Sequence, residues 1–453
     1  MSSTAAFANV FRVPDLRKKI MLTLGLLFIY RIGFHIPLPG VDVRVLQGLA
    51  DKASGNDILG LMNVLSGGRL NLPVLFSLGI LPYITASIIF SLLVKVVPRL
   101  EALSKEGPAG QRKINQLTRV ATVPLTMVQG IILCTTQFRN LQGPVGASDV
   151  QTYMIPAFHD GSLWSTIYVG FMIVAGLTAG TMFVMWLGEQ ITEFGIGNGA
   201  SLIIMAGIIA SLPQVLGKLV SDAVDDRSQV LVMAVLFIVF IFVVFGVVLI
   251  TRGQRRIPIQ QAKLMRGRKM VGGARHYLPL KVNMANVMPV IFASSLLMFP
   301  NLIYNMVAGS HSGLLPAGGW WYSVLFIGLI FFFSFFWTSM MFQPAEMANN
   351  LKEYGSFIPG IRPGKKTAEF LERVMVRVTL AGSFFLAIIA ILPNLIAASL
   401  NVDALTASFL GGTSILIIVG VALDLVDKLN AQLVASNYEG FMGATAAKRG
   451  GAA

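Results

Sequence analysis

Residues 230–251 read VLVMAVLFIVFIFVVFGVVLIT, and this run contains no Asp, Glu, Lys or Arg. An α-helix of about 20 apolar residues is long enough to cross the hydrocarbon core of a bilayer, which is about 30 Å thick. The run therefore predicts a transmembrane helix.

The composition of the whole chain is that of a membrane protein. Of its 453 residues, 55% are hydrophobic and 12% charged, with a mean hydropathy of +0.73, whereas a soluble domain carries about 25% charged residues. A tenth candidate span, residues 20–36, is interrupted only by Arg31, which can snorkel to the interface. No signal-peptide cleavage site precedes it, so we expect it to be retained. Besides residues 230–251, eight more runs contain no Asp, Glu, Lys or Arg, and together they make nine charge-free spans. They are residues 73–94, 120–138, 161–188, 194–217, 282–310, 318–345, 378–402 and 404–423.

The basic residues lie mainly in alternate loops. With ten helices in order, 28 of the 35 Lys and Arg fall on one side of the membrane and 6 on the other. By the positive-inside rule the richer side faces the cytoplasm, so both termini are predicted to be cytoplasmic. The net charge of +14 therefore reflects topology and does not by itself indicate a free nucleic-acid-binding protein.

Two of the predicted cytoplasmic loops, residues 252–281 and 343–373, are unusually long at about 30 residues each. Long basic loops predict a docking surface for a large acidic or ribonucleoprotein partner. The methionine-containing stretch 263–270, KLMRGRKM, is not assigned to any partner.

The spans divide into two groups of five. We expect an N-terminal half over residues 1–217, an external hinge over residues 218–228 and a C-terminal half over residues 229–453. Because five is odd, the two halves must have opposite orientations in the membrane, as in inverted-repeat transporters. The predicted fold class is thus an all-α integral membrane protein with ten transmembrane helices in two inverted halves.

One apolar segment is too short to cross the bilayer. Residues 58–71 read ILGLMNVLSGGRLN, which predicts either a short re-entrant helix beside an outer cavity or a helix lying in the interface. The polar and small residues that interrupt it are Asn63, Ser66, Gly67, Gly68 and Arg69.

Signatures of catalysis are not found. The chain has neither a phosphate-loop motif nor an H-E-x-x-H zinc motif, and its four histidines are far apart in sequence. Residues 195–199, GIGNG, follow a span and not a strand, so they predict a tight cytoplasmic turn. We predict no metal and no cofactor, and energy for any transport must come from a partner or a gradient.

Three classes of function remain open on this basis: a passive conduit, a secondary transporter or lipid flippase, and an intramembrane enzyme. A carrier is expected to hold ionisable residues inside its spans, and an enzyme a base beside a nucleophile. The charge-free spans hold neither, which favours a conduit. Carboxylates near the predicted cytoplasmic ends of helices are interpreted as solvated caps, namely Glu189, Glu193, Asp424 and Asp427.

The polar motifs, in their order, resemble those of the SecY/Sec61-alpha family, the pore-forming subunits of protein translocases, over nearly the whole chain. The matching stretches are RIGFHIPLPGVD (31–42), SGGRLNLPVLFSLGILPYITASII (66–89), KEGPAGQRKINQLTR (105–119), GTMFVMWLGEQITEFGIGNGASLII (180–204), RGQRRIPIQQAK (252–263), LPLKVNMANVMPVIFASSLLMFP (278–300), FIPGIRPGKKT (357–367) and GGTSILIIV (411–419).

The resemblance implies an hourglass pore that is closed by an outer plug and by a ring of aliphatic side chains. The short segment 58–71 matches the plug. A narrow apolar collar excludes water and ions by dewetting, yet makes no sequence-specific hydrogen bond with a passing polypeptide. By motif matching the ring falls on Ile80, Ile84, Ile204, Ile291 and Ile417.

The resemblance also implies a lateral gate, a seam that opens toward lipid between the spans 73–94 and 282–310. Prolines 82, 289 and 300 are expected to weaken these helices locally, or to be kinks needed only for packing. The residues assigned to the gate are Thr85, Ser87, Ser294, Ser295 and Phe299.

The cytoplasmic loops are implied to dock partners. Arg362 lies in the stiff turn PGIRPG, which can present its guanidinium outward to a carboxylate or phosphate. The docking set is Arg255, Arg256, Arg362 and Lys365. The implied partners are the small membrane subunits SecE and SecG, the SecA motor ATPase, the ribosome with its rRNA, signal sequences of preproteins, membrane lipids, the YidC insertase and SecDF. The implied function is translocation of unfolded preproteins across the bacterial inner membrane, with sideways release of hydrophobic segments into lipid.

Overall fold

The computed structural model describes residues 13–39, 74–136, 163–225, 227–261, 264–266, 269–271, 275–308, 319–399 and 412–450. Within these ranges, each of the ten predicted spans corresponds to one helix. The ten are α2 (Pro14–Gly33), α5 (Leu81–Val96), α7 (Pro108–Thr136), α8 (Leu163–Phe194), α9 (Gly199–Asp225), α10 (Arg227–Arg252), α11 (Met288–Ala308), α12 (Trp320–Met341), α14 (Lys365–Ser399) and α16 (Gly412–Gly450). The shorter helices α6 (Pro98–Lys105) and α13 (Pro344–Glu353) lie between spans.

Length and apolar composition identify six membrane-crossing helices among the described residues, which involve α7, α8, α9, α10, α12 and α14. Helix α5 qualifies only together with α6, from which it is bent by 97°. Helix α2 carries Asp15, Arg17, Lys18 and Lys19 near its start, which lowers its apolar character. Of the predicted span 404–423, residues 412–423 belong to α16, and residues 404–411 lie outside the described residues.

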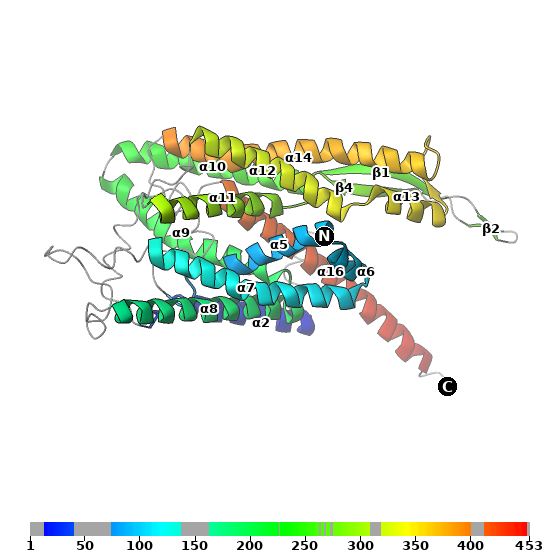
Figure 1. Ribbon diagram of the computed structural model, residues 1–453. Helices are drawn as coiled ribbons and strands as arrows, with labels where there is room; N and C mark the ends of the chain where they lie inside the picture. The colour runs from blue at the N-terminus through cyan, green and yellow to red at the C-terminus, as the bar shows by residue number, and fades with distance from the viewer. Residues whose placement is uncertain are drawn as a thin grey trace.

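The helices lie roughly along one common direction in two groups (Figure 1). Helix α7 packs against α5 and α8 in one group, and α14 packs against α12, α10 and α16 in the other. The groups meet where α11 contacts α5 and α7, and where α9 contacts α10 and α16. A large core cluster of buried apolar side chains draws residues from both groups, including Ile84, Ile204, Ile291 and Ile417.

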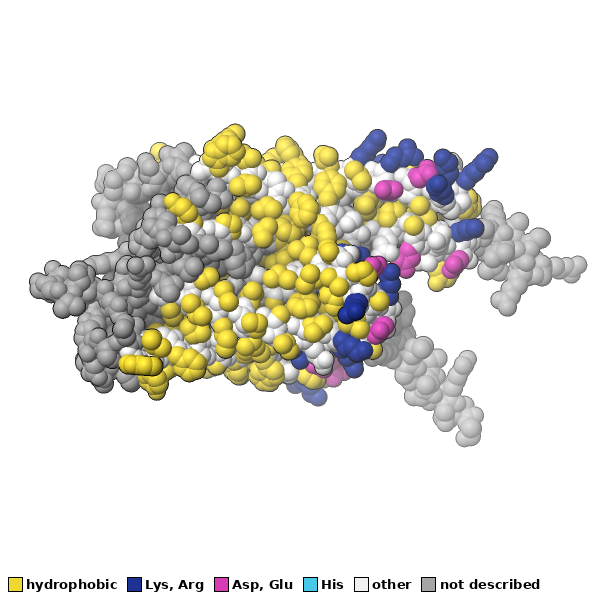
Figure 2. All heavy atoms as spheres, viewed as in Figure 1, with side chains coloured by type: hydrophobic (Ala, Val, Ile, Leu, Met, Phe, Trp, Pro, Cys, Tyr) yellow, Lys and Arg dark blue, Asp and Glu magenta, His cyan; other side chains and the backbone are white. Residues whose placement is uncertain are grey.

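Basic side chains gather at one end of the molecule. On the face shown in Figure 2, Lys and Arg concentrate near the end where α6, α13, β1 and β4 lie in Figure 1, and the middle of the bundle is largely apolar. The loops at this end are ones that the sequence predicts to lie on the basic side.

The two long basic loops form a β-sheet, which the sequence analysis did not anticipate. Strand β1 (Gln254–Gln261) pairs antiparallel with β4 (Arg275–Lys281), and β5 (Ser356–Phe357) from the other loop pairs with the end of β1. The strand order is β4-β1-β5, and a separate pair joins β2 (Leu264–Arg266) to β3 (Lys269–Val271). The stretch 263–270 therefore contributes to this second pair.

The sequence of β1, QRRIPIQQ, explains why it forms a strand. Ile257 and Ile259 are buried while their neighbours are more exposed, which is the two-residue period of a half-buried strand. Pro258 lacks an amide proton, and it is tolerated because β5 pairs only with Gln260 and Gln261. Ile257 packs in a small core with Leu280, Phe342, Ile358, Leu371 and Val374, which ties the sheet to α14.

The GIGNG motif forms the predicted tight turn between α8 and α9. Gly197 has a φ of 93°, and a Cβ atom at Gly195 would lie 2.5 Å from the hydroxyl oxygen of Thr23. A Cβ atom at Gly199 would collide with the carbonyl oxygen of Gly188. The Ser201 amide donates to Oδ1 of Asn198 at 3.3 Å and so caps α9.

Two predicted boundaries differ from the structure. The span 73–94 becomes α-helical only at Leu81, since the preceding residues form turns in which Gly79 has a φ of 54°. The segment expected as the external hinge, residues 218–228, is helical as far as Asp225 and again from Arg227. Apolar and helix-forming residues continue α9 past its last predicted membrane residue.

The predicted plug, residues 58–71 with Asn63, Ser66, Gly67, Gly68 and Arg69, lies outside the described residues. The chain on either side of it is held together: the amide of Leu75 donates to the carbonyl of Ile36 at 2.9 Å. Pro37 and Val74 form an isolated bridge. The described ends of this stretch therefore meet at one place.

Candidate functional site

A cavity of about 320 Å³ lies where α5, α7, α8, α9 and α11 come together. Ile84, Ile204 and Ile291 line it, together with Phe292 of α11. The charged part of its wall comes from α7 and α8, and includes Arg119 and Glu189 beside Asn115. The cavity thus has an apolar portion formed by three different helices and a charged portion formed by two.

The structure brings the five predicted ring residues into one core. The exposed fraction is 1% for Ile80, 8% for Ile84, 3% for Ile204, 6% for Ile291 and 1% for Ile417. All five belong to the same hydrophobic cluster. They come from the N-terminal side of α5 and from α9, α11 and α16, so segments far apart in sequence contribute to one large core shared by the two groups of helices, and Ile84, Ile204 and Ile291 also line the cavity.

The predicted gate residues lie on α5 and α11, which contact each other. The hydroxyl of Thr85 is buried and donates to the carbonyl of Leu81 at 3.0 Å, and that of Ser294 donates to Ile291 at 2.9 Å. Ser87 lines the cavity. Helix α11 includes Phe299, but the description does not extend to its side chain.

Ser295 of α11 and Gln129 of α7 carry buried polar atoms that lack partners among the described residues. The hydroxyl of Ser295 and both amide atoms of Gln129, on α7, make no hydrogen bond there. A buried polar group without a partner costs about 1–3 kcal/mol. Gln129 was not among the predicted site residues, although an amide inside an apolar run is a signal in the sequence.

The three prolines of α5 and α11 lie at two kinds of position. Pro82 is in the first turn of α5, where a missing amide proton breaks no helical hydrogen bond. Pro289 is the second residue of α11, and Pro300 alone of the three is inside a helix. Two of the three expected weak points are therefore helix starts.

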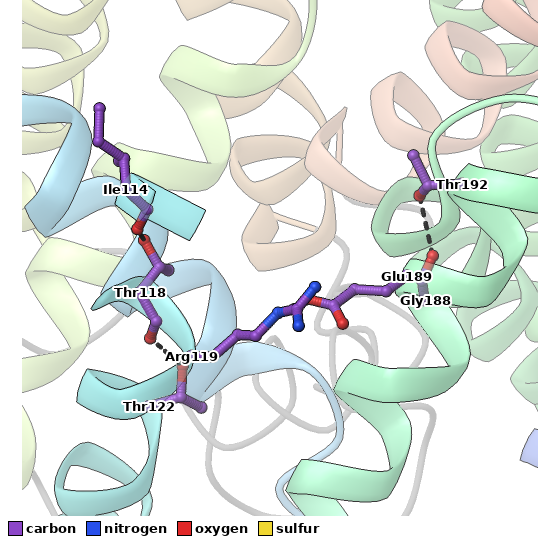
Figure 3. Close-up of polar contacts among 7 residues, drawn as sticks. All are labelled: Ile114, Thr118, Arg119, Thr122, Gly188, Glu189 and Thr192. Carbon is purple, nitrogen blue, oxygen red and sulfur yellow. Dashed lines mark hydrogen bonds and ion pairs between the residues drawn. The ribbon is translucent and has the colours of Figure 1, made fainter. Parts of the chain in front are cut away.

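Glu189 is not the solvated helix cap that the sequence suggested. Its Oε1 accepts a hydrogen bond from Nε of Arg119 at 2.6 Å, and the side chains point toward each other from α8 and α7 (Figure 3). The exposed fraction is 48% for the Arg119 side chain and 21% for Glu189. The pair was missed because its members are 70 residues apart.

Hydrogen bonds along both helices fix the backbone that carries this pair. The hydroxyls of Thr118 and Thr122 donate to carbonyls one turn back on α7, at 3.0 and 2.8 Å (Figure 3). The hydroxyl of Thr192 donates to Gly188 and accepts from the amide of Gly199, both at 2.8 Å. The start of α9 is thereby tied to the last turns of α8.

Asp427 is likewise more than a cap. It lies 3.7 Å from Nη1 of Arg252 and 3.9 Å from Nζ of Lys281, so α16 meets the end of α10 and the end of β4. The side chains of all three are about half exposed, and such pairs are worth about 0–1 kcal/mol. The contact is a junction between the bundle and the sheet.

The predicted docking residues share one end of the molecule. Arg255 and Arg256 are exposed on β1, and Arg362 and Lys365 are exposed around the turn after β5. Pairing of Gln260 with Phe357 joins the two loops. Within the turn, the hydroxyl of Thr367 donates to the carbonyl of Arg362 at 2.9 Å.

The glycines of this turn are required by its backbone. Gly360 and Gly364 have φ values of 80° and 99°, which L side chains rarely adopt. The PGIRPG turn is therefore held from within, and the side chain of Arg362 remains outside it.

Among the described residues, no group of His, Cys, Asp and Glu is arranged to hold a metal ion.

Comparison with known proteins identifies the family of the chain. The SecY family model matches residues 74–426. The chain belongs to the SecY family. It is 45% identical over 452 residues to protein translocase subunit SecY of Streptomyces coelicolor, covering 96% of this chain and 99% of the relative. It is 43% identical over 460 residues to the subunit of Corynebacterium glutamicum, covering 97% of this chain and all of the relative.

Solved structures of SecY and Sec61 share the fold. A structure of a protein conducting channel gives a TM-score of 0.63 at 20% identity, and covers 92% of both chains. Canine Sec61 in a ribosome-channel complex gives 0.59 at 17% identity, again with 92% of both chains covered. The chain is therefore a multi-pass membrane protein with the SecY fold of ten helices in two halves.

Family membership decides among the three classes of function that the sequence left open. A SecY-family subunit is a translocase channel subunit and not a catalytic enzyme. The cavity and the isoleucine cluster accordingly belong to a channel rather than to a carrier or an enzyme.

Proposed function

We propose that the chain is the central subunit of the channel that translocates unfolded preproteins across the bacterial plasma membrane and releases hydrophobic segments sideways into lipid. The observation that carries the proposal is the convergence of Ile80, Ile84, Ile204, Ile291 and Ile417 in one buried cluster between the two groups of helices. A collar of this kind seals by excluding water, and any extended polypeptide can displace it because it offers no fixed hydrogen bonds.

The seam is the contact of α5 with α11. Its hydroxyls at Thr85 and Ser294 are satisfied within their own helices, so the two helices can separate without losing those hydrogen bonds. Separation would open the cavity, which already lies between α5 and α11, toward lipid. A segment apolar enough to prefer hydrocarbon would leave by this route.

The plug role of residues 58–71 is part of the same proposal. The meeting of Leu75 with Ile36 supports it, because a segment that leaves and returns at one place suits a re-entrant closure. The halves 1–217 and 229–453 are proposed to move about the connection at residues 218–228.

The energy source and the docking partners are proposed to be external to this chain. The exposed basic set at β1 and the PGIRPG turn can bind carboxylates of a motor ATPase, for which we propose SecA, and the phosphates of ribosomal RNA. The canine Sec61 structure, which was solved in a ribosome-channel complex, supports the ribosome as a partner. We propose SecE and SecG as membrane subunits of the complex, with YidC and SecDF as further partners.

The proposed location is the bacterial inner membrane, with both termini in the cytoplasm. The gathering of basic side chains at the sheet end supports this orientation through the positive-inside rule (Figure 2).

Reconstitution tests the proposed function. The chain is placed in proteoliposomes with the small membrane subunits, and a preprotein is offered with or without the motor and ATP. We expect protease-protected preprotein only when both are added. Uptake without the motor would contradict the assignment of the energy source. Uphill movement of a small solute by the chain alone would instead identify a carrier.

A further inference from the structure

The charge of the cavity is opposite to that of the chain as a whole. The chain carries a net +14, and Lys and Arg dominate its sheet end (Figure 2). Among the described residues that line the cavity, the charged ones are Arg119, Glu189 and Glu193. One cation and two carboxylates leave the lining with net negative charge.

The two carboxylates lie one helical turn apart on α8, at positions i and i+4, and so share one face of that helix. Glu189 is paired with Arg119, whose Nε lies 2.6 Å from Oε1 of Glu189 (Figure 3). Glu193 is exposed and forms no ion pair with any residue in the described ranges. The carboxylate pair therefore holds one resident cation and has capacity for another.

An apolar surface lies beside these carboxylates in the same cavity. Ile84, Ile204, Ile291 and Phe292 line it. The complementary ligand is a peptide with one or more cationic side chains followed by an apolar run. A secretory signal peptide has that order, with a basic n-region preceding an apolar h-region.

We propose that Glu189 and Glu193 receive the basic n-region of an incoming signal peptide, and that Arg119 is a resident counter-ion which the n-region displaces from Glu189. The inference rests on the proposed function and adds a residue-level determinant of client choice. Arg119 is half exposed, and water screens a pair of that exposure, so exchange of one cation for another is easy. The apolar run then lies against the isoleucines.

The experiment measures translocation of one preprotein whose n-region carries zero, one, two or three Lys, in reconstituted complexes of fixed lipid composition. Three channels are compared with the unchanged protein: Glu189→Gln with Glu193→Gln, Arg119→Gln, and a control with Glu101→Gln and Glu106→Gln. The control removes the same charge from carboxylates on the exposed segment after α5, where they pair with Lys105 and Lys113.

The expected result is a change in the dependence on n-region charge. The advantage of three Lys over none should fall about two- to fivefold in the carboxylate variant, as expected for loss of exposed ion pairs. It should rise in Arg119→Gln, because Glu189 is then vacant, and stay unchanged in the control. A gain in one variant is not explained by poor folding.

Two outcomes would overturn the inference. One is an unchanged charge dependence in the carboxylate variant. The other is a fall in charge dependence for Arg119→Gln, which would make the pair a purely structural link between α7 and α8. If the unchanged channel moves no preprotein at all, the proposed function fails and not this inference alone.

Discussion

The cavity region and the sheet end of the molecule use charge in opposite ways. At the sheet end, Arg255, Arg256 and Arg362 are exposed and face solvent. Beside the pore, Arg119 is matched to Glu189 within a small cavity. The first arrangement suits a large partner that arrives from solution, since unpaired guanidinium groups keep their bonding capacity. The second suits a chain that passes through, since the cation of the cavity is already paired with a carboxylate. Substitutions in the two regions should therefore impair different steps of transport.

The largest expected effect is at the seam. In a chain with Cys134→Ser, the pair Thr85→Cys and Phe299→Cys should form a disulfide on mild oxidation if their Cα atoms are about 5–7 Å apart in the closed gate. The crosslinked channel should release no signal sequence into lipid, and reduction should restore release. Gel mobility and an insertion assay measure both steps.

Either single-cysteine variant serves as the control, because it cannot form the intramolecular bond. Efficient crosslinking with full insertion would show that the helices touch there but that the gate lies elsewhere.

The next effect is at the docking surface. Arg362→Glu should lower preprotein export roughly tenfold or more, because a charged hydrogen bond is worth about 1.5–3 kcal/mol and a reversed charge also repels the partner. Export is followed by protease protection, and immunoblotting checks that the channel remains in the membrane.

Lys352→Glu makes the same charge change on α13, outside the PGIRPG turn, and should have a much smaller effect. Equal losses from the two substitutions would mean that only the overall charge of this end matters, and that the turn has no specific role.

The pore region should respond through leakage instead of docking. Ile84→Asn with Ile417→Asn places amides in a cluster where both isoleucines are now buried. Water is stabilised beside amides, so resting ion conductance should rise severalfold. Planar-bilayer recording of the purified complex measures it.

Ile257→Asn, in the small core beneath the sheet, is the matched change away from the pore and should leave resting conductance unaltered. If the double variant conducts like the unchanged channel, those positions do not form the seal.

The sequence predicted the ten helices because nine of them coincide with a local run without charge, and residues 20–36 are interrupted only by Arg31. It did not predict the β4-β1-β5 sheet, because β5 has only two residues and its pairing with β1 joins positions about 100 apart in the chain. The alternation in QRRIPIQQ was a usable signal for β1 alone.

The same distinction holds at the site. Each ring isoleucine is an ordinary apolar helix residue in sequence, so the family resemblance, and not its pattern, singled it out. Arg119 and Glu189 were each visible as charged residues, but their pairing is a property of how α7 packs on α8. Local patterns were enough to predict the helices, whereas the site depends on tertiary packing, which those patterns do not specify.

The smallest expected effect is on α6, at an exposed ion pair. Nζ of Lys105 lies 2.8 Å from Oε1 of Glu101, one turn away, and this hydrogen bond is the main cause that lowers the pKa of Glu101 below 4.5. Since the folded-state pKa is depressed, the contribution to stability is fully present above the unfolded-state pKa and is lost as pH falls through the folded-state value. Glu101→Gln mimics the protonated state, so it should slightly speed amide hydrogen exchange in α6 at neutral pH and match the unchanged protein under acid conditions. A difference that persisted at low pH would mean that Glu101 supports α6 by something other than its charge. Because water surrounds this pair, its loss should leave transport unaltered, in contrast to loss of Glu189 inside the cavity.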